Sequence, residues 1–329
     1  MRIRTMIAAA ALLGAGSTAA AAQQVNETRS TSATGTVEVH GISGQVRVVG
    51  WGRNQVQVTG SLSGSGERLE IEDAGGDVVV RVVYPRGRNH STGRGTQLEV
   101  RVPSRKDLEV NMVSASVNVE GVDGSVEVHG VSGGIRVANS RSREITAASR
   151  SGSVDITADA DRVEAHSVSG TVTVAGSVRD RVEANSVSGS VRVTASAGSV
   201  EAGSVSGSVE IASMRGRAEV HSVSGDVRVT GRALSGSFQT VSGEIVISGD
   251  LARGSDLELT THSGSVTLQL APGASASLDF TTFSGGIEAD YPGARVTRPS
   301  RREARVTVGG GDARVTAQTF SGDVRLVRR

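Results

Sequence analysis

The chain of 329 residues contains no cysteine, only 5 prolines, and aromatic residues amounting to 2%. Without cysteine it can form no disulfide, use no thiolate nucleophile and carry no lipid on an N-terminal cysteine. With so few rings, its core cannot be built around Phe, Tyr or Trp. The 43 glycines and the abundant Val, Ala, Ser and Thr indicate instead a thin interior of small and β-branched side chains, which favours an all-β fold.

Residues 1–22 are predicted to be a secretory signal peptide. Arg2 and Arg4 form a positive n-region, an apolar stretch follows over residues 6–16, and alanines precede the expected cleavage site at Gln23. No later segment is long and apolar enough to span a bilayer. We therefore expect an exported protein in the periplasm, on the cell surface or outside the cell. After cleavage 33 basic residues stand against 34 acidic ones, a balance that predicts no binding to nucleic acid.

The dominant feature of the sequence is an internal repeat marked by the dipeptide Ser-Gly. Most successive copies are 18 or 19 residues apart, and the last ones are separated by 21 and 37. The repeat glycines are Gly133, Gly152, Gly170, Gly189, Gly207, Gly225, Gly243, Gly264, Gly285 and Gly322, with Gly44 as an early copy and Ala115 in place of one glycine. This period is typical of a solenoid and too short for a propeller blade, which needs about 40 residues.

Each repeat contains two short stretches in which apolar and polar residues alternate, one before the glycine, as at Val163 and Ala165, and one after it, as at Val172. Such alternation predicts strands with one buried face, and no Asn-Gly hairpin turn connects them. We predict an all-β fold, a single-stranded parallel β-helix (β-solenoid) of about 18 residues per turn in which each turn stacks on the last, right-handed by the crossover rule. Residues 23–105 form an N-terminal β capping region, and residues 106–329 form the solenoid continuous with it.

The serine before each repeat glycine has two interpretations, a nucleophile or a corner residue. So many copies, with no regular His–Asp partner, favour the corner. There a serine hydroxyl can bind the turn backbone, while glycine supplies the positive φ that a tight turn often needs.

Two polar rows are predicted on the outward face, six and four residues before the repeat glycine. Their members are Glu38, Glu109, Glu127, Glu164, Glu183, Glu201, Glu219 and Glu258, and His40, His129, His166 and His221. Stacked carboxylates could bind Ca²⁺, for which residues 309–312 offer a single glycine-rich motif. Arg162, Arg181 and Arg217 precede three of the glutamates by two residues and can offset the repulsion without metal. The histidines stand at least two turns apart, too far to share a transition metal.

An enzyme acting on envelope glycans is a rival interpretation. It would need acidic residues beside a groove built by long loops, and aromatic platforms for sugars. Turns of this length leave no room for loops, and Trp51, Tyr84 and Tyr291 lie outside the regular repeat. Two basic segments, 85–95 and 292–305, interrupt the repeat, and we interpret them as solvated loops, with contact to an anionic envelope polymer as the alternative. No catalytic, cofactor-binding or metal-binding residue is predicted.

The order of several segments resembles that of a known family. These are V-R-V-V-G-W-G-R-N-Q-V-Q-V (46–58), L-E-V-R-V-P-S-R-K-D-L-E-V (98–110), the S-V-S-G-x-V-x-V turns, and T-F-S-G-D-V-R-L (319–326). Over residues 35–329 the chain resembles the bacterial putative-adhesin family of β-strand-repeat domains. The resemblance implies a parallel β-helix in an exported envelope protein of unknown biochemical activity, and it brings no catalytic or binding residues.

These observations predict a non-enzymatic envelope or cell-surface protein that acts by contact, as an adhesin or a structural scaffold. Its partner would be an envelope polymer or another surface protein. The alternatives are a glycan-active enzyme and a periplasmic accessory protein of an envelope stress response. Rows that stay uniform from turn to turn favour contact over catalysis.

We expect the protein isolated from its native host to begin at Gln23, because the n-region, apolar stretch and alanines form a complete cleavage signal. N-terminal sequencing measures this directly. A cytosolic chain that retains Met1 would contradict the prediction of export.

Overall fold

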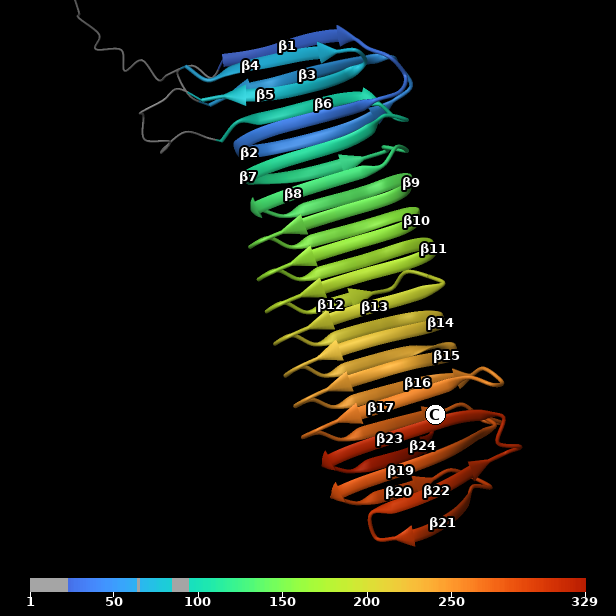
Figure 1. Cartoon of the computed structure of the whole chain (residues 1–329). Helices are drawn as coiled ribbons and strands as arrows, with labels where there is room; N and C mark the ends of the chain where they lie inside the picture. The colour runs from blue at the N-terminus through green and yellow to red at the C-terminus, as the bar shows by residue number, and fades with distance from the viewer. Residues whose placement is uncertain (1–22, 64–65, 85–94) are drawn as a thin grey trace, which may run out of the picture.

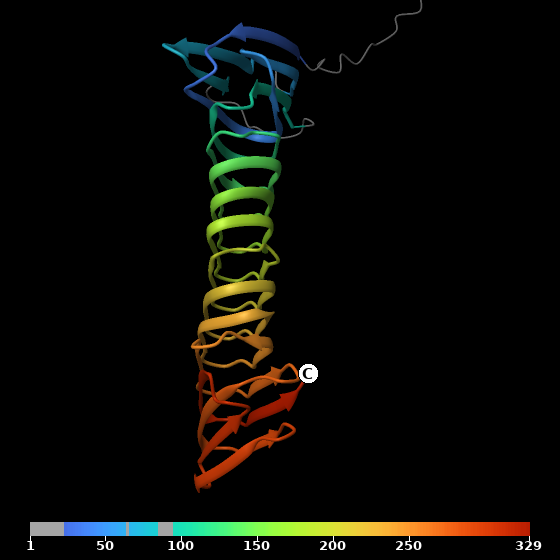
Figure 2. The same cartoon turned by 90° about the vertical axis from the view of Figure 1, so that its right-hand side faces the viewer.

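The computed structural model describes residues 23–63, 66–84 and 95–329, and within them all regular structure is β-strand. The strands stack into an elongated rod (Figure 1), and successive turns form one narrow column when it is seen from the side (Figure 2). The all-β prediction is confirmed. The predicted signal peptide and most of the first basic segment, residues 85–94, lie outside the described residues. No helix in the described part is long and apolar enough to cross a membrane.

The central part of the rod is a coil of parallel strands. They are β7 (Asp107–Glu120), β8 (Val126–Ser132), β9 (Ile135–Ser149), β10 (Val154–Ser167), β11 (Val172–Ser186), β12 (Val191–Val193), β13 (Ser199–Ser204), β14 (Val209–Ser222), β15 (Val227–Thr240), β16 (Ile245–Leu251), β17 (Asp256–Thr261) and β18 (Val266–Leu270). Val172 of β11 lies opposite Val154 of β10 on one edge and opposite Val191 of β12 on the other. The spacing of the repeat glycines is therefore also the pairing register.

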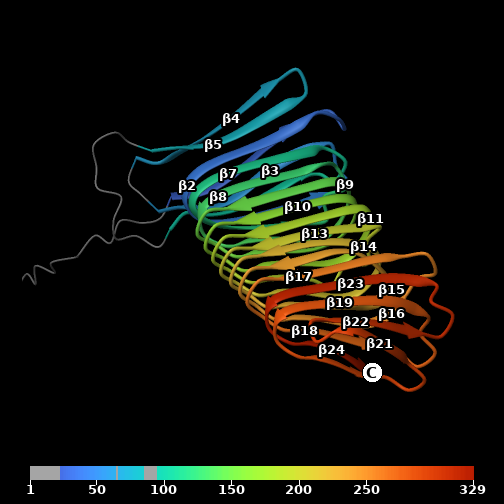
Figure 3. The same ribbon diagram turned by 60° about the horizontal axis from the view of Figure 1, so that its bottom comes forward.

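At the N-terminal end, additional strands cover the first turn. They are β1 (Gln23–Ser30), β2 (Thr36–Trp51), β3 (Gln55–Leu62), β4 (Arg68–Ala74), β5 (Asp77–Val83) and β6 (Gln97–Pro103). β2 pairs in parallel with β7, and also with β5 and β6. β4 pairs antiparallel with β5, β3 with β6, and β1 with β3. β4 and β5 project beyond the stack (Figure 3). The Tyr84 hydroxyl accepts a hydrogen bond from the N–H of Ile42 at 3.0 Å and so holds the corner of the first turn.

At the C-terminal end the turns do not follow the order of the sequence. The strands are β19 (Ala276–Ser284), β20 (Ile287–Asp290), β21 (Arg295–Ser300), β22 (Glu303–Val308), β23 (Ala313–Ser321) and β24 (Val324–Arg328). β23 pairs with both β17 and β19, and β24 with both β18 and β20. The last turn of the chain thus lies between two earlier turns (Figure 1).

The expectation that every turn stacks on the one before it is therefore wrong at this end. The reason is the second basic segment, 292–305, which we interpreted as a solvated loop. It contains β21 and the start of β22, which pair antiparallel with each other, and β22 also pairs antiparallel with β19. Because β22 occupies the outer edge of β19, the chain can complete the sheet only by returning to the inner edge.

The interior consists of ladders of like side chains. Val209 has no exposed surface and lies between Val191 and Val227, which are equally buried. Each inward residue therefore packs on the residue at the same register in the turns above and below. Stability in such a stack is close to a sum of interactions between neighbouring turns.

Successive corners are tied together by a buried hydroxyl three residues before the repeat glycine. Ser186 Oγ accepts a hydrogen bond from the N–H of Gly189 at 3.0 Å and donates one to the carbonyl of Gly170, in the preceding turn, at 2.9 Å. The same donor bond is made by Ser149, Ser167, Ser204, Thr240, Thr261, Thr282 and Thr319. The serine immediately before the glycine, to which we assigned this role, is exposed, as at Ser188.

The repeat glycine is required mainly by close approach between turns. A Cβ atom at Gly189 would lie 2.0 Å from the carbonyl oxygen of Gly170. Gly189 does not have a positive φ, although Gly133, at the corresponding place, has a φ of 119°. The predicted positive φ therefore does not explain the glycine at most corners.

Val209→Asp should destabilise the protein by several kcal/mol, because it places a carboxylate without a partner in the aliphatic ladder. Glu210→Ala removes an ion pair with Arg192 from a half-exposed site and should cost less than about 1 kcal/mol. Denaturant unfolding of both variants measures the difference. Equal losses would show that the inward and outward assignments are wrong.

Ser186→Ala should cost about 1–3 kcal/mol, because it leaves the part-buried N–H of Gly189 and the carbonyl of Gly170 without their partner. Ser188→Ala, two residues away and exposed, should change the free energy of unfolding by less than about 0.5 kcal/mol. Chemical denaturation compares the two. The corner bond does not hold the turns together if both variants unfold like the parent protein.

Candidate functional site

The outward face of one sheet carries the two polar rows that were predicted. Alternation turns residues six and four before the repeat glycine to the same side, since they are two positions apart. Glu164, Glu183, Glu201 and Glu219 lie opposite one another on successive strands. The carboxylates are therefore aligned along the rod and accessible to solvent.

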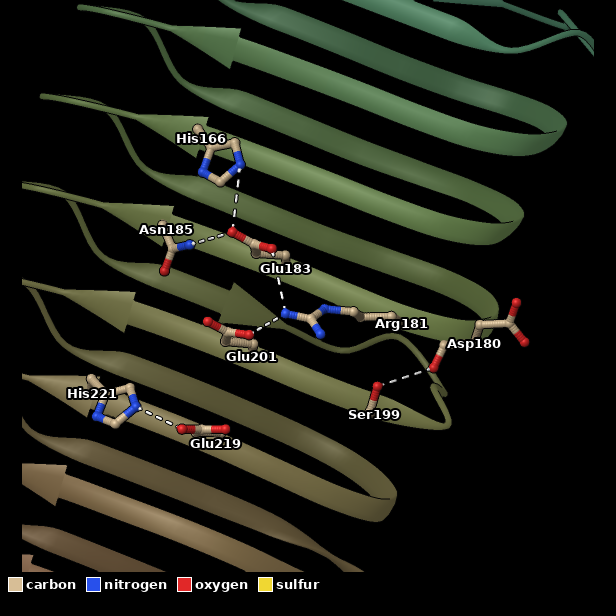
Figure 4. Close-up of polar contacts among 9 residues, drawn as sticks. All are labelled: His166, Asp180, Arg181, Glu183, Asn185, Ser199, Glu201, Glu219 and His221. Atoms are coloured by element: carbon tan, nitrogen blue, oxygen red, sulfur yellow. Dashed lines mark hydrogen bonds and ion pairs between the residues drawn. The ribbon is translucent and has the colours of Figure 1, made fainter.

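Cations and amides of the same face pair with these carboxylates (Figure 4). The guanidinium of Arg181 contacts Glu183 at 3.6 Å and also contacts Glu201. Glu183 further accepts a hydrogen bond from Asn185 at 3.2 Å and lies 3.9 Å from His166. A cation between successive carboxylates offsets their repulsion, so the row needs no calcium ion to form.

Arg162 and Arg217 were predicted to play the same role. The structure describes both residues, and neither forms an ion pair. Three of the four histidines also pair with the glutamate two residues earlier on the same strand, whereas His166 lies near Glu183 of the next strand. The pairs are His40–Glu38 at 3.2 Å, His129–Glu127 at 2.7 Å and His221–Glu219 at 3.2 Å. In the described part of the chain, no group of three His, Asp or Glu is arranged to hold a metal ion.

A row of exposed apolar residues, here named the apolar ridge, runs along the corner two residues before the repeat glycine. Its aliphatic members are 41–48% exposed: Ile42, Val113, Val131, Val168, Val187, Val205, Val223 and Val241. Arg150 interrupts the row. The ridge was not predicted from the sequence, because V-S-G was interpreted only as a turn. Continuing the strand alternation from Glu164 and His166 would have placed Val168 outward.

At the C-terminal end of the ridge, rings take the place of valine. The His262 and Phe320 rings stack with centroids 4.9 Å apart and planes at 9°, and the Phe320 and Phe283 rings with centroids 4.8 Å apart and planes at 5°. The guanidinium of Arg302 lies 4.4 Å from the centroid of the Phe283 ring. This stack exists because β23 lies between β17 and β19.

A groove lies at each end of the rod, between the apolar ridge and the polar row four residues before the repeat glycines. The C-terminal groove has a volume of about 610 Å³ and is bounded by the ring stack and by Gln318. The N-terminal groove, of about 460 Å³, is bounded by Arg81 and Val131. Another groove, of about 570 Å³, lies on the strands that follow the repeat glycines, beside Arg47.

Groups with shifted pKa values lie in the N-terminal part of the rod. Arg47 donates a hydrogen bond to Glu120 at 2.7 Å and, together with Asn118, lowers the pKa of that carboxyl below its usual value. Lys106 is the only lysine of the chain. It is buried and donates a hydrogen bond to the Thr31 hydroxyl at 2.9 Å, and burial lowers its pKa below the usual value. Lys106 thus fastens the cap from inside.

Comparisons with solved structures find distant similarities, among them the following three. A putative cell adhesion protein from Clostridium sporogenes is 8% identical, with 93% of this chain and 100% of that chain covered and a TM-score of 0.20. A putative adhesin from Bacteroides fragilis is 10% identical, with coverages of 93% and 97% and a TM-score of 0.38. A putative lipid binding protein from Parabacteroides distasonis is 17% identical, with coverages of 74% and 96% and a TM-score of 0.37. No curated protein matches the chain.

The family comparison is more informative. The profile of the Toastrack DUF4097 family matches residues 21–228 and again residues 160–327. The two matches overlap within the coil and together extend over nearly the whole described part of the chain. They confirm the family resemblance inferred from the sequence and agree with a β-solenoid-like repeat. The chain therefore belongs to the Toastrack DUF4097 family.

Proposed function

We propose that this protein is an exported, non-enzymatic binding protein of the cell envelope that acts by contact along its side, as an adhesin or a structural scaffold. In the finer description that we propose, residues 106–329 form a right-handed parallel β-helix of about 18 residues per turn. Residues 23–105 cap it, and residues 1–22 direct export. The partner would be an envelope polymer or another surface protein.

The observation that carries this proposal is the apolar ridge. Aligned, exposed aliphatic side chains are not needed to fill the core, and contiguous apolar surface commonly marks an interaction site. The ridge repeats at the strand spacing of about 4.8 Å. An extended partner would therefore touch many turns at once, and contacts that are individually weak would act together.

The pairing of the carboxylates supports binding over catalysis. Hydrolysis of a glycan generally uses two carboxyl groups on either side of the scissile bond, one of them able to donate a proton. Here Glu183 and Glu201 share the cation of Arg181, and Glu219 faces His221. The carboxyl group with a lowered pKa, Glu120, does not line either groove beside the ridge.

Replacing Val168, Val187 and Val205 together by serine removes three consecutive members of the ridge. We expect the purified chain from residue 23 onward to sediment with the envelope fraction of its native host, and the triple variant to lose most of this binding. The physical reason is the loss of apolar surface that contact would remove from water.

The control carries three changes in the same turns, immediately after the repeat glycines and outside the ridge: Thr171→Ala, Ser190→Ala and Ser208→Ala. It should bind like the parent protein. If the ridge variant binds equally well, the proposed contact surface is wrong. Steady release of reducing ends from the envelope polysaccharides, abolished by one acidic substitution, would show instead that the protein is an enzyme.

A further inference from the structure

The C-terminal groove differs from the N-terminal groove in the chemistry of its two walls. One wall is the polar row, in which Gln239, Thr260, Gln318 and Thr281 occupy neighbouring strands in that spatial order. The other wall is the ring stack of His262, Phe320 and Phe283. Between them the buried threonines of the corners form the floor, and their hydroxyls donate to glycine carbonyls of the coil.

The exposure of the rings is not explained by folding. The chain has only 4 phenylalanines. Phe238 and Phe280 are buried in the core, whereas Phe283 and Phe320 are 53% and 49% exposed. They come from β19 and β23, which are neighbours only because of the unusual order of the C-terminal turns (Figure 1). Half of the phenylalanine content is therefore placed side by side at the surface, where the coil elsewhere carries valine.

The orientation of the rings determines what they can contact. Because they stack on one another along the rod, with Arg302 beside the last ring, their faces are occupied. Their edges form the wall of the groove. Ring edges carry partial positive charge, which suits electron-rich oxygen atoms.

The charge around the groove disfavours an anionic ligand. Apart from His221, which pairs with Glu219, the polar wall consists of amides and hydroxyls, which both donate and accept hydrogen bonds. At its end, Arg302 and Glu303 contribute opposite charges. The next row outward includes Glu219 and Glu258, and this acidic border repels anions.

The backbone around the groove cannot pair with an extended peptide. β17 pairs with β15 and β23, β23 with β17 and β19, and β19 with β23 and β22. Both edges of each strand are therefore occupied, and strand addition, a common mode of peptide binding, is not available. Recognition in the groove must rely on side-chain amides, hydroxyls and ring edges that repeat at about 4.8 Å.

We propose that this groove binds a neutral glycan chain lying along the axis of the rod, with hydroxyls on the polar row and sugar oxygen atoms against the ring edges. From His221 to Glu303 the groove spans six neighbouring strands, which is about 24 Å at the usual strand spacing. That length accommodates several sugar rings. The inference rests on the proposed contact function and names the ligand of one of the two grooves beside the ridge.

The test is isothermal titration of the chain from residue 23 onward with linear neutral hexasaccharides of β-linked glucose and of β-linked N-acetylglucosamine. Gln318→Ala and Phe320→Ser should each weaken the binding of a neutral hexasaccharide roughly tenfold or more. Gln318 is exposed and truncation should leave the fold intact, so this variant decides the result if Phe320→Ser lowers stability. Thr267→Ala, on β18 and outside the groove, is the control and should bind like the parent protein.

The proposal is overturned if neither neutral hexasaccharide binds, if both variants bind like the parent, or if hexagalacturonate or an extended polar peptide binds more tightly. These outcomes are separable from failure of the proposed function. A protein that binds no neutral glycan but still sediments with envelopes through the apolar ridge is a contact protein with a different ligand. A protein that binds neither would refute both proposals.

Discussion

In four successive turns of the coil, a buried serine hydroxyl, from Ser149 to Ser204, bonds to the backbone at the repeat glycines of two neighbouring turns. The bonds of Ser186 to Gly189 and Gly170 are short enough that the two corners nearly touch, and a Cβ atom on the glycine would collide with the carbonyl of the turn before it. The hydroxyl and the bare glycine therefore act together. One sets the register between turns, and the other permits the distance at which that register can be kept.

A fixed register has consequences for the outside of the rod. Because residues at corresponding places in successive turns lie opposite one another, the outward residues also form straight rows. The glutamates, the histidines and amides, and the apolar ridge all arise in this way. Outward residues can change without disturbing the ladder of valines inside. The replacement of valine by His262, Phe320 and Phe283 is such a change, and it gives the C-terminal groove a wall of rings instead of aliphatic side chains.

The alternation of valine and alanine in each repeat was enough to predict an all-β protein, and the glycine spacing was enough to predict the pairing register of the central strands. The hydroxyl that binds the turn backbone was predicted two residues from its true position. Ser186 and Ser188 belong to the same short motif, and only burial distinguishes them. The order of the C-terminal turns was not predictable in this way. β19 and β23 carry the same apolar pattern, so either could follow β17, and the outcome depends on which edge β22 occupies.

The ring stack was missed for a related reason, since Phe283 and Phe320 are far apart in the sequence and meet only through that reordering. The segment that causes it, with its arginines and prolines, has the composition of a loop but serves as an edge. β21 is exposed along its whole length and contains Pro299, which has no N–H to offer to a further strand. At the other end, β1 and β4 each pair with one strand only. β4 is rich in charged residues and β1 in polar ones, features that discourage strand addition. Both ends of the rod therefore oppose growth by edge pairing, which leaves the side of the coil, with its ridge and grooves, as the surface best suited to contact a partner.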